Sequence, residues 1–377
     1  MNRQKLFAIT SLLAFLMFSV ILSSAAAQAA SAEDIEIVDL YSSIDSADVT
    51  LHSGAHHTDI TIDADLILDD KVLISKRFII DEALPDTDIT KVVYWDINSP
   101  AEEEFYITRV TLSVAGSVQK TQYRNFSYGG PALPRVYIED IIPDSRGVST
   151  ILSPYRTMYG TQAVLADVEY MLVDGDTVIY RTMDRRVSVV QTTPLSRNWN
   201  VRLSNNHPYS ARVKVAVPSP RLRDSVIVQY ADFTAEDDAR ITELYRDETG
   251  ASVTVEGHSQ VPFAGDIIFI VSKDGKTVEE IREESPILMS DDDETIEVEW
   301  GERLPAGNYE LSIELVGNDD DLVDVLDTII EAEEKRYYDS SEAPTTASEK
   351  TSGFGTIPAV LAIIAIGLLH QFRMRLR

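Results

Sequence analysis

The sequence predicts an all-β protein made of three tandem β-sandwich domains, preceded by a signal peptide and followed by one transmembrane helix. Two observations support the repeated domain. The three tryptophans of the chain, Trp95, Trp199 and Trp300, are separated by 104 and 101 residues, and apolar and polar side chains alternate around them. A repeat of about 100 residues is too long for a solenoid unit, so each copy is large enough to bury its own core.

Each tryptophan has the same surroundings along the chain. A polar turn lies 24 or 25 residues before it, and a tyrosine follows it by 11, 10 or 9 residues. These tyrosines, Tyr106, Tyr209 and Tyr309, begin runs in which every second residue is apolar. This period of two is typical of antiparallel strands with one buried face, and we place the tryptophans in the preceding strand. We therefore expect all six aromatic side chains to belong to the structural core.

Residues 1–32 have the three parts of a secretory signal peptide. Arg3 and Lys5 precede the apolar run 6–22, an alanine-rich stretch fills 25–30, and acidic residues are absent. This layout predicts that the protein is exported. An uncleaved membrane anchor is the alternative.

The three domains are expected at residues 33–130, 134–232 and 238–333. About seven alternating segments per copy, separated by turn residues, indicate an immunoglobulin-like or fibronectin-like sandwich. The tyrosine after each tryptophan resembles the tyrosine corner of that fold, in which the hydroxyl holds the crossover between the sheets. Residues 235–245 are rich in helix formers and could hold a short helix, but their match to the start of the first copy favours a strand.

The end of the chain predicts a membrane anchor. The polar segment 339–353 cannot bury enough apolar surface to fold, so we expect a disordered stalk. The uncharged segment 354–372 is long enough to cross a bilayer as a helix. The three arginines of 373–377 fit a cytoplasmic basic end, which leaves the bulk of the chain outside. A buried core helix is the alternative for the apolar segment.

A resemblance to a known family accompanies this pattern. Ser352, Gly353 and Phe354, the apolar span and the terminal arginines resemble the PGF-CTERM sorting signal of archaeal surface proteins, over about the last 27 residues. Ser352 stands where that family has proline. The resemblance implies an archaeosortase-type processing enzyme as a partner, which would remove the tail and transfer the protein to a lipid anchor. A plain transmembrane anchor is the alternative. The rest of the chain is similar to tandem β-sandwich domains of unknown function in such proteins.

Composition excludes one class of partner. The chain has no cysteine, so its domains must be stable without disulfides. Once residues 1–32 and 354–377 are set aside, 28 basic residues face 62 acidic ones, which gives a net charge of −34. Nucleic-acid binding needs basic patches, so we expect no nucleic-acid partner. An acidic surface suits a self-repelling surface protein in a medium whose salt screens the charge.

No catalytic constellation is recognisable, and we expect no enzyme. His52, His56 and His57 could ligate a transition metal, but no acidic residue that would orient them is evident, which favours surface histidines. The acidic runs 291–294 and 319–321 could supply oxygen ligands for Ca²⁺. Neither run has EF-hand spacing, which favours solvated loops.

Asn125 begins the only N-linked glycosylation sequon of the chain, Asn125-Phe126-Ser127, a match that chance alone can produce. Two classes of function remain open. The first is an anchored, non-catalytic surface protein with a structural or adhesive role, whose partners would be other surface proteins or glycans. The second is an extracytoplasmic ligand- or metal-binding subunit of a membrane complex. An exposed aromatic or polar cluster at a domain junction would favour the second.

Overall fold

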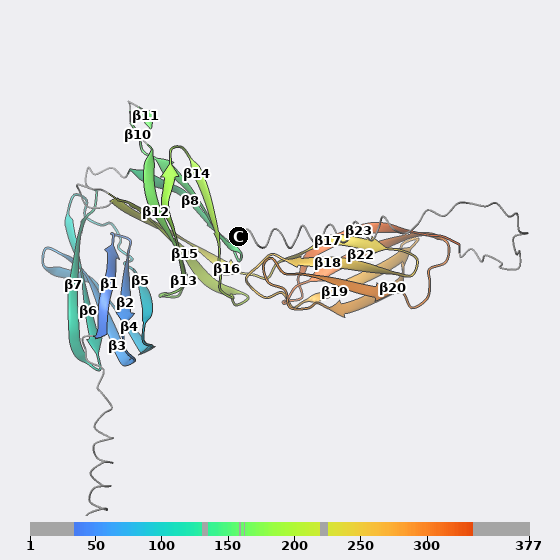
Figure 1. The fold of residues 1–377 in the computed structure, drawn as a ribbon, viewed down its shortest axis with the longest axis horizontal. Helices are drawn as coiled ribbons and strands as arrows, with labels where there is room; N and C mark the ends of the chain where they lie inside the picture. Colours follow the sequence, from blue (N-terminus) through green and yellow to red (C-terminus); the bar gives the residue numbers. More distant parts are fainter. Residues whose placement is uncertain (1–33, 130–134, 158–159, 162, 219–224, 335–377) are drawn as a thin grey trace, which may run out of the picture. The chain divides into compact units, whose positions relative to one another are not determined.

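The protein, seen here as a computed structural model, is built from β-strands, and its described residues contain no α-helix (Figure 1). The structure describes residues 34–129, 135–157, 160–161, 163–218 and 225–334. All strands belong to the first of the two units of the chain, Met1–Ala332, the second being Glu333–Arg377. The predicted signal peptide, stalk, transmembrane segment, basic end and sorting motif lie outside the described residues. Within the ranges given above, no helix is long and apolar enough to cross a membrane.

The first domain consists of two antiparallel sheets with the strand orders β1-β2-β5 and β4-β3-β6-β7. Its strands are β1 (Ile35–Ser42), β2 (Ser46–Ser53), β3 (His57–Leu68), β4 (Lys71–Ala83), β5 (Thr87–Tyr94), β6 (Phe105–Val114) and β7 (Ser117–Ser127). One face of each sheet contributes to a shared apolar core that includes Trp95 and Tyr106.

The second domain has the strand orders β8-β9-β14 and β13-β12-β15-β16, with a separate two-stranded hairpin, β10-β11. Its strands are β8 (Val136–Pro143), β9 (Gly147–Pro154), β10 (Arg156–Thr157), β11 (Gly160–Thr161), β12 (Val164–Asp174), β13 (Thr177–Val189), β14 (Thr193–Asn198), β15 (His207–Val217) and β16 (Ser225–Ala235). Trp199 and Tyr209 lie in its core.

The third domain has the strand orders β17-β18-β21 and β20-β19-β22-β23. Its strands are β17 (Ala239–Arg246), β18 (Gly250–Gly257), β19 (Asp266–Lys273), β20 (Lys276–Glu284), β21 (Asp293–Glu299), β22 (Gly307–Val316) and β23 (Leu322–Ala332). Its core contains Trp300 and Tyr309.

All three domains share one topology. If the β10-β11 hairpin is set aside, the first, second and fifth strands of each domain form one sheet, and the fourth, third, sixth and seventh form the other. In a constant-type immunoglobulin domain the fourth strand joins the first sheet instead, so the order here is the fibronectin-like one. The first strand carries a register shift at the same place in each copy: Ile37/Asp39, Ile138/Asp140 and Ile241/Glu243. The predicted all-β fold of tandem sandwiches is thus confirmed.

The tryptophans lie immediately after the fifth strand of each domain, and not within it as the sequence pattern predicted. The difference arises because their backbone N–H groups bond to the turn between the first two strands and not to a neighbouring strand. The bonds run from Trp95 to Asp45 O (3.0 Å), from Trp199 to Arg146 O (2.9 Å) and from Trp300 to Thr249 O (2.9 Å). All three indole rings are buried.

The tyrosines hold the loop that precedes the sixth strand. Tyr106 donates its hydroxyl to Ala101 O at 3.1 Å, and Tyr309 donates to Pro305 O at 2.9 Å. In the second domain the hydroxyl of Tyr209 accepts from the backbone N–H of Ser204 at 3.2 Å. Each tyrosine therefore fixes a loop four or five residues upstream, which is the arrangement of a tyrosine corner.

The segment 235–245 forms strand and not helix. Strand β16 continues to Ala235, beyond the predicted domain end at residue 232, and β17 begins at Ala239. The side chain of Ala235 is buried in the core of the second domain. Only residues 236–238 separate the two strands, so these two domains follow one another almost directly.

Candidate functional site

The three histidines considered as metal ligands do not converge. His52 Nδ1 lies 2.8 Å from Asp88 Oδ1, and His56 Nε2 lies 2.7 Å from Glu82 Oε1, while the His57 side chain is buried. Sequence reasoning found no acidic partner because these carboxylates are 36 and 26 residues away and are brought close by strand pairing. In the described part of the chain, no group of three or more His, Cys, Asp or Glu side chains is placed to hold a metal ion.

The acidic runs considered for Ca²⁺ contain carboxylates that bond to donors of the protein itself. Asp291 Oδ1 accepts from Arg146 Nη2 at 2.8 Å. Asp319 Oδ2 accepts from the side-chain amides of Asn205 and Asn206 at 2.7 and 2.6 Å. Arg146, Asn205 and Asn206 belong to the second domain, so these runs contribute to its junction with the third.

A second set of contacts builds the same junction from backbone groups. Leu203 N donates to Gln260 O at 2.9 Å, and Gln260 N donates to Ser145 O at 3.0 Å. The neighbouring Val261 packs into the core of the second domain although it follows that domain in the chain. The third domain thus completes the core of the second.

Charged faces meet at the junction between the first and second domains. On β2, the residues that alternate with the core positions are Ser46, Asp48 and Thr50, and on β15 they include Arg212 and Lys214. Such residues point away from the core of their own domain. All five are nevertheless buried. Hydrogen bonds from Arg212 and Lys214 on β15 to Ser46 and Asp48 on β2 show that each face covers the other.

Asp48 is the centre of a buried ionic network. Its two carboxylate oxygens accept hydrogen bonds from Arg212 Nη2 at 2.9 Å and from Lys214 Nζ at 2.8 Å. Arg212 Nη1 donates to Ser46 Oγ at 2.7 Å, and Lys214 Nζ donates to Asp39 Oδ2 on β1 at 2.9 Å. The side chains of Arg212 and Asp48 are 0% and 2% exposed, so this ion pair is shielded from water.

The network continues into the second domain through Glu169 on β12. Its Oε2 lies 3.9 Å from Lys214 Nζ, and its Oε1 accepts from Arg181 Nε on β13. Three cations therefore face three carboxylates: Arg181, Lys214 and Arg212 against Asp39, Asp48 and Glu169. Buried charges are tolerated when they are paired and hydrogen-bonded, and removing one partner typically costs about 3–5 kcal/mol.

The surroundings of Lys214 keep it charged. Burial on its own lowers the pKa of Lys214, but the carboxylates of Asp48 and Asp39 outweigh this effect and raise it above the ordinary value of 10.5. The ring of Tyr41 lies beside both cations, with its centroid 5.2 Å from Lys214 Nζ and 5.9 Å from Arg212 Cζ. These distances are within the range of cation–π attraction. Burial raises the pKa of the Tyr41 hydroxyl, which keeps that ring neutral.

Backbone pairing reinforces the same junction. Lys91 on β5 pairs with Thr177 on β13, which joins the sheets of the two domains into one of seven strands. Val92 N donates to Asp176 O at 2.8 Å. Lys91 Nζ donates to Asp176 Oδ1 at 2.6 Å and to Thr177 Oγ1 at 2.7 Å. The first two domains are therefore connected by strand pairing as well as by charge.

A cleft beside this junction presents aromatic and charged side chains. Tyr94 of the first domain and Tyr230 of the second meet edge to face, with their ring centroids 4.8 Å apart. The lining also includes Asp232 and an ion pair, Lys76 Nζ to Asp96 Oδ2, at 3.4 Å. Tyr230 is exposed and Tyr94 is half-buried, so this junction has an aromatic and polar cluster of the kind that would favour a ligand-binding subunit.

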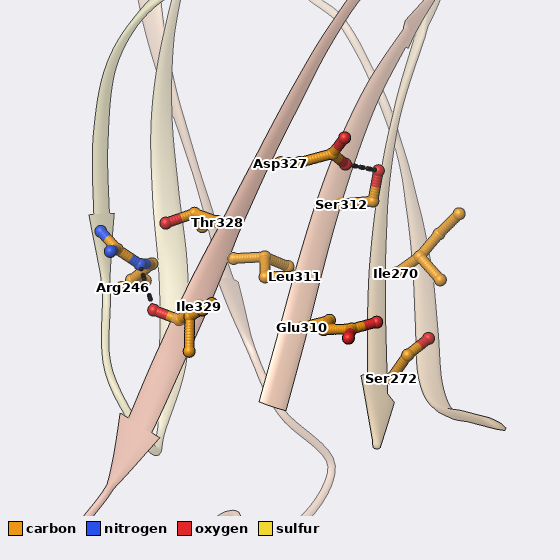
Figure 2. Close-up of a pocket in the computed structure, with 9 residues that line it drawn as sticks. All are labelled: Arg246, Ile270, Ser272, Glu310, Leu311, Ser312, Asp327, Thr328 and Ile329. Atoms are coloured by element: carbon orange, nitrogen blue, oxygen red, sulfur yellow. Dashed lines mark hydrogen bonds between the residues drawn. The ribbon is translucent and has the colours of Figure 1, made fainter. Parts of the chain in front are cut away.

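Figure 2 shows a second, shallow pocket on the third domain. It lies over β19, β22 and β23, and Arg246 enters it from β17 (Figure 2). Ser312 Oγ donates to Asp327 Oδ1 at 2.6 Å, and Arg246 Nε donates to Ile329 O at 2.8 Å. Neither histidine nor lysine lines the pocket, so neither of its two serines, Ser272 and Ser312, has a base of either type beside it in the lining.

Comparisons with known proteins give distant matches among solved structures. No protein-family model matches the chain. No curated protein matches it either. Among solved structures, the FN1–FN3 domains of chicken CNTN1 match with 15% identity and a TM-score of 0.20, covering 79% of this chain and 97% of that one. A tetra-tandem repeat from the extending region of a large adhesion protein matches with 6% identity and a TM-score of 0.23, covering 79% and 73%.

The α2-macroglobulin of E. coli also matches, with 10% identity and a TM-score of 0.21, over 76% of this chain and 21% of that one. At these TM-scores the likenesses carry no argument about fold or function. The sandwich assignment rests on the strand orders and cores described above.

Sequence reasoning missed the ionic network entirely. Arg212 and Lys214 alternate with the core residues of β15, and this pattern normally indicates a solvated face. One signal was present: a basic pair on the outward face of a strand in a chain where acidic residues outnumber basic ones by 62 to 33. A local excess of positive charge in so acidic a chain predicts an acidic partner, which here is a neighbouring domain of the same chain.

Proposed function

We propose that this chain is a non-catalytic cell-surface protein with a structural or adhesive role, exported and held at the membrane by its C-terminus. The observation that carries this proposal is the buried ionic network between the first two domains. Parting these domains would break the hydrogen bonds that Asp48 accepts from Arg212 and Lys214, together with the pairing of Lys91 with Thr177. The junction is thus suited to hold two sandwiches in a fixed relation, as a spacer or scaffold requires.

The sequence patterns of residues 1–32 and 354–377 support the proposed location. Residues 1–32 would direct export, and the segment 354–372 would hold the protein at the membrane either as a span or as a sorting signal read by an archaeosortase-type enzyme. The acidic ectodomain suits a surface coat, whose partners would be other surface proteins or glycans rather than nucleic acid.

The test combines location with intact mass. Cells are treated with an external protease, and the protein from untreated membranes is weighed intact. We expect the ectodomain to be digested on intact cells and the mature chain to lack residues 1–32. A mass that includes Arg377 would identify a plain transmembrane anchor, and a shorter mass with added lipid would identify sorting. Protection from the protease, with residues 1–32 retained, would contradict the proposal.

A second candidate function is favoured by the cleft that contains Tyr94 and Tyr230. An aromatic pair beside carboxylates suits a saccharide, which offers an apolar ring face together with hydroxyl donors. If this candidate is correct, the fixed junction holds Tyr94 and Tyr230 in place before the saccharide binds. Saccharide binding by the full chain on a glycan array, lost in Tyr230→Ala and kept in the exposed control Tyr245→Ala, would support it. Equal array profiles for the two variants would remove this candidate.

A further inference from the structure

The sequon at Asn125 lies on an accessible edge of the first domain. Strand β7 is the last strand in the order β4-β3-β6-β7 and pairs only with β6 in that sheet. Phe126 packs against the core and stacks on Tyr106 with ring centroids 5.6 Å apart. Because successive side chains in a strand point to opposite faces, Asn125 and Ser127 point outward, and both are exposed.

Exposed apolar side chains lie on the outward face around Asn125, beside Arg109, which pairs with Tyr123. Phe105 is 74% exposed, more than any other large hydrophobic side chain among the described residues, and it pairs directly with Ser127. Tyr123, 61% exposed, lies two residues before Asn125 and therefore on the same face. Ile107 is directly opposite Asn125. The sequon asparagine thus has an apolar residue opposite it and exposed aromatic rings near it on both strands.

We propose that Asn125 carries an N-linked glycan whose first sugars lie on Phe105 and Tyr123. Exposed apolar groups at a sheet edge favour association with other chains, and a soluble protein normally covers or interrupts them. The C–H face of a sugar ring is apolar and packs on an aromatic ring. A glycan on Asn125 would cover the two rings and also place a hydrophilic barrier along the β7 edge.

The modification is a group transfer from a lipid-phosphate-linked oligosaccharide. The side-chain nitrogen of Asn125 forms a bond to the anomeric carbon of the first sugar. The bond from that carbon to the phosphate oxygen breaks, and the lipid phosphate leaves with the electron pair. The amide nitrogen releases one proton. The inference rests on the export included in the proposed function, because the acceptor must reach the compartment where this transfer occurs.

The first measurement uses the protein isolated from its native membrane. Trypsin cleavage after Arg124 and Arg135 releases peptide 125–135, which contains the sequon and no other asparagine. We expect this peptide to carry a saccharide mass on Asn125. An unmodified peptide, from a protein that external protease digests on intact cells, would overturn the inference and leave the proposed function standing.

The second measurement locates the sugars. Hydroxyl-radical footprinting compares the native protein with Asn125→Gln and Ser127→Ala, both made in the same host, since each removes the sequon by a different change. Labelling of Phe105 and Tyr123 should be at least about twofold higher in both variants, because their rings lose the cover of the glycan. Tyr245, 65% exposed in the third domain, is the internal control and should be labelled equally in all three. A glycosylated Asn125 with equal labelling of Phe105 and Tyr123 would overturn the packing.

Discussion

Replacing Asp48 by alanine should destabilise the first two domains more than any surface charge change. Asp48 accepts hydrogen bonds from both Arg212 and Lys214, and its side chain is 2% exposed. Its removal leaves two buried cations short of a partner. Breaking a buried ion pair in this way costs about 3–5 kcal/mol. For a folded unit of about 150–250 residues, a change of 1 kcal/mol lowers the Tm by about 2–4 °C, so we expect a fall of roughly 6–20 °C.

The chain supplies its own probes for this experiment. Each domain contains one tryptophan, so variants that keep a single tryptophan and carry phenylalanine at the other two positions report on one domain at a time. Trp95 and Trp199 fluorescence should both respond to Asp48→Ala during thermal unfolding. Trp300 should respond much less, because the network does not reach the third domain.

The matched control is Asp63→Ala in the same domain. Asp63 forms an ion pair with Arg77, whose side chain is 68% exposed, and a solvated pair contributes little to stability. Asp63→Ala should therefore leave the Trp95 and Trp199 transitions nearly unchanged. If Asp48→Ala shifts these transitions no more than Asp63→Ala does, the reasoning about the buried network is refuted.

Four further outcomes are expected. Because the pKa of Lys214 is raised in the folded protein, this residue stabilises the fold at pH values below the ordinary pKa of 10.5, and the contribution is lost as the pH rises through the raised pKa. Above pH 10.5 the Tm followed by Trp199 fluorescence should therefore fall more steeply with pH in the wild type than in Lys214→Met. Parallel plots of Tm against pH for the two proteins would contradict this. Tyr309→Phe removes the hydrogen bond that the hydroxyl donates to Pro305 O and the long one that it accepts from Lys273 Nζ at 3.4 Å. The loss should cost about 0.5–1.5 kcal/mol in urea unfolding followed by Trp300 fluorescence, whereas no loss would exclude a tyrosine corner. Trp199→Ala should cost about 3–5 kcal/mol by calorimetry, and intact stability would overturn its assignment to the core. Millimolar Ca²⁺ should leave the Tm of every domain unchanged, because Asp291 and Asp319 already accept hydrogen bonds from donors of the second domain. A rise in Tm with Ca²⁺ that a chelator reverses would contradict this.

The fold was predictable because local pattern and burial agree in each copy. Trp95, Trp199 and Trp300 mark a recurring position after the fifth strand, and Tyr106 and its counterparts mark the start of the sixth. Period-two alternation identifies which side of a strand faces its own core. The same pattern cannot show whether the other side meets water or another domain.

The junction illustrates that limit. Arg212 and Lys214 lie 164 and 166 residues after Asp48 in the chain, and each of the three has the pattern of a solvated position. Their burial depends on how two folded domains pack against each other, and the period-two pattern of a strand carries no information about contacts between domains. The same limit applies to Tyr94 and Tyr230, which form a cluster only because the domains are adjacent.

The most direct test of the central claim is a distance measurement across the junction of the first two domains. The chain has no cysteine, so single cysteines at exposed Val118 and Met183 can carry spin labels without a competing thiol. Pulsed electron paramagnetic resonance should give one narrow distance distribution in the wild type and a broader one in Asp48→Ala. A broad distribution in the wild type that Asp48→Ala does not change would contradict a junction fixed by the buried network.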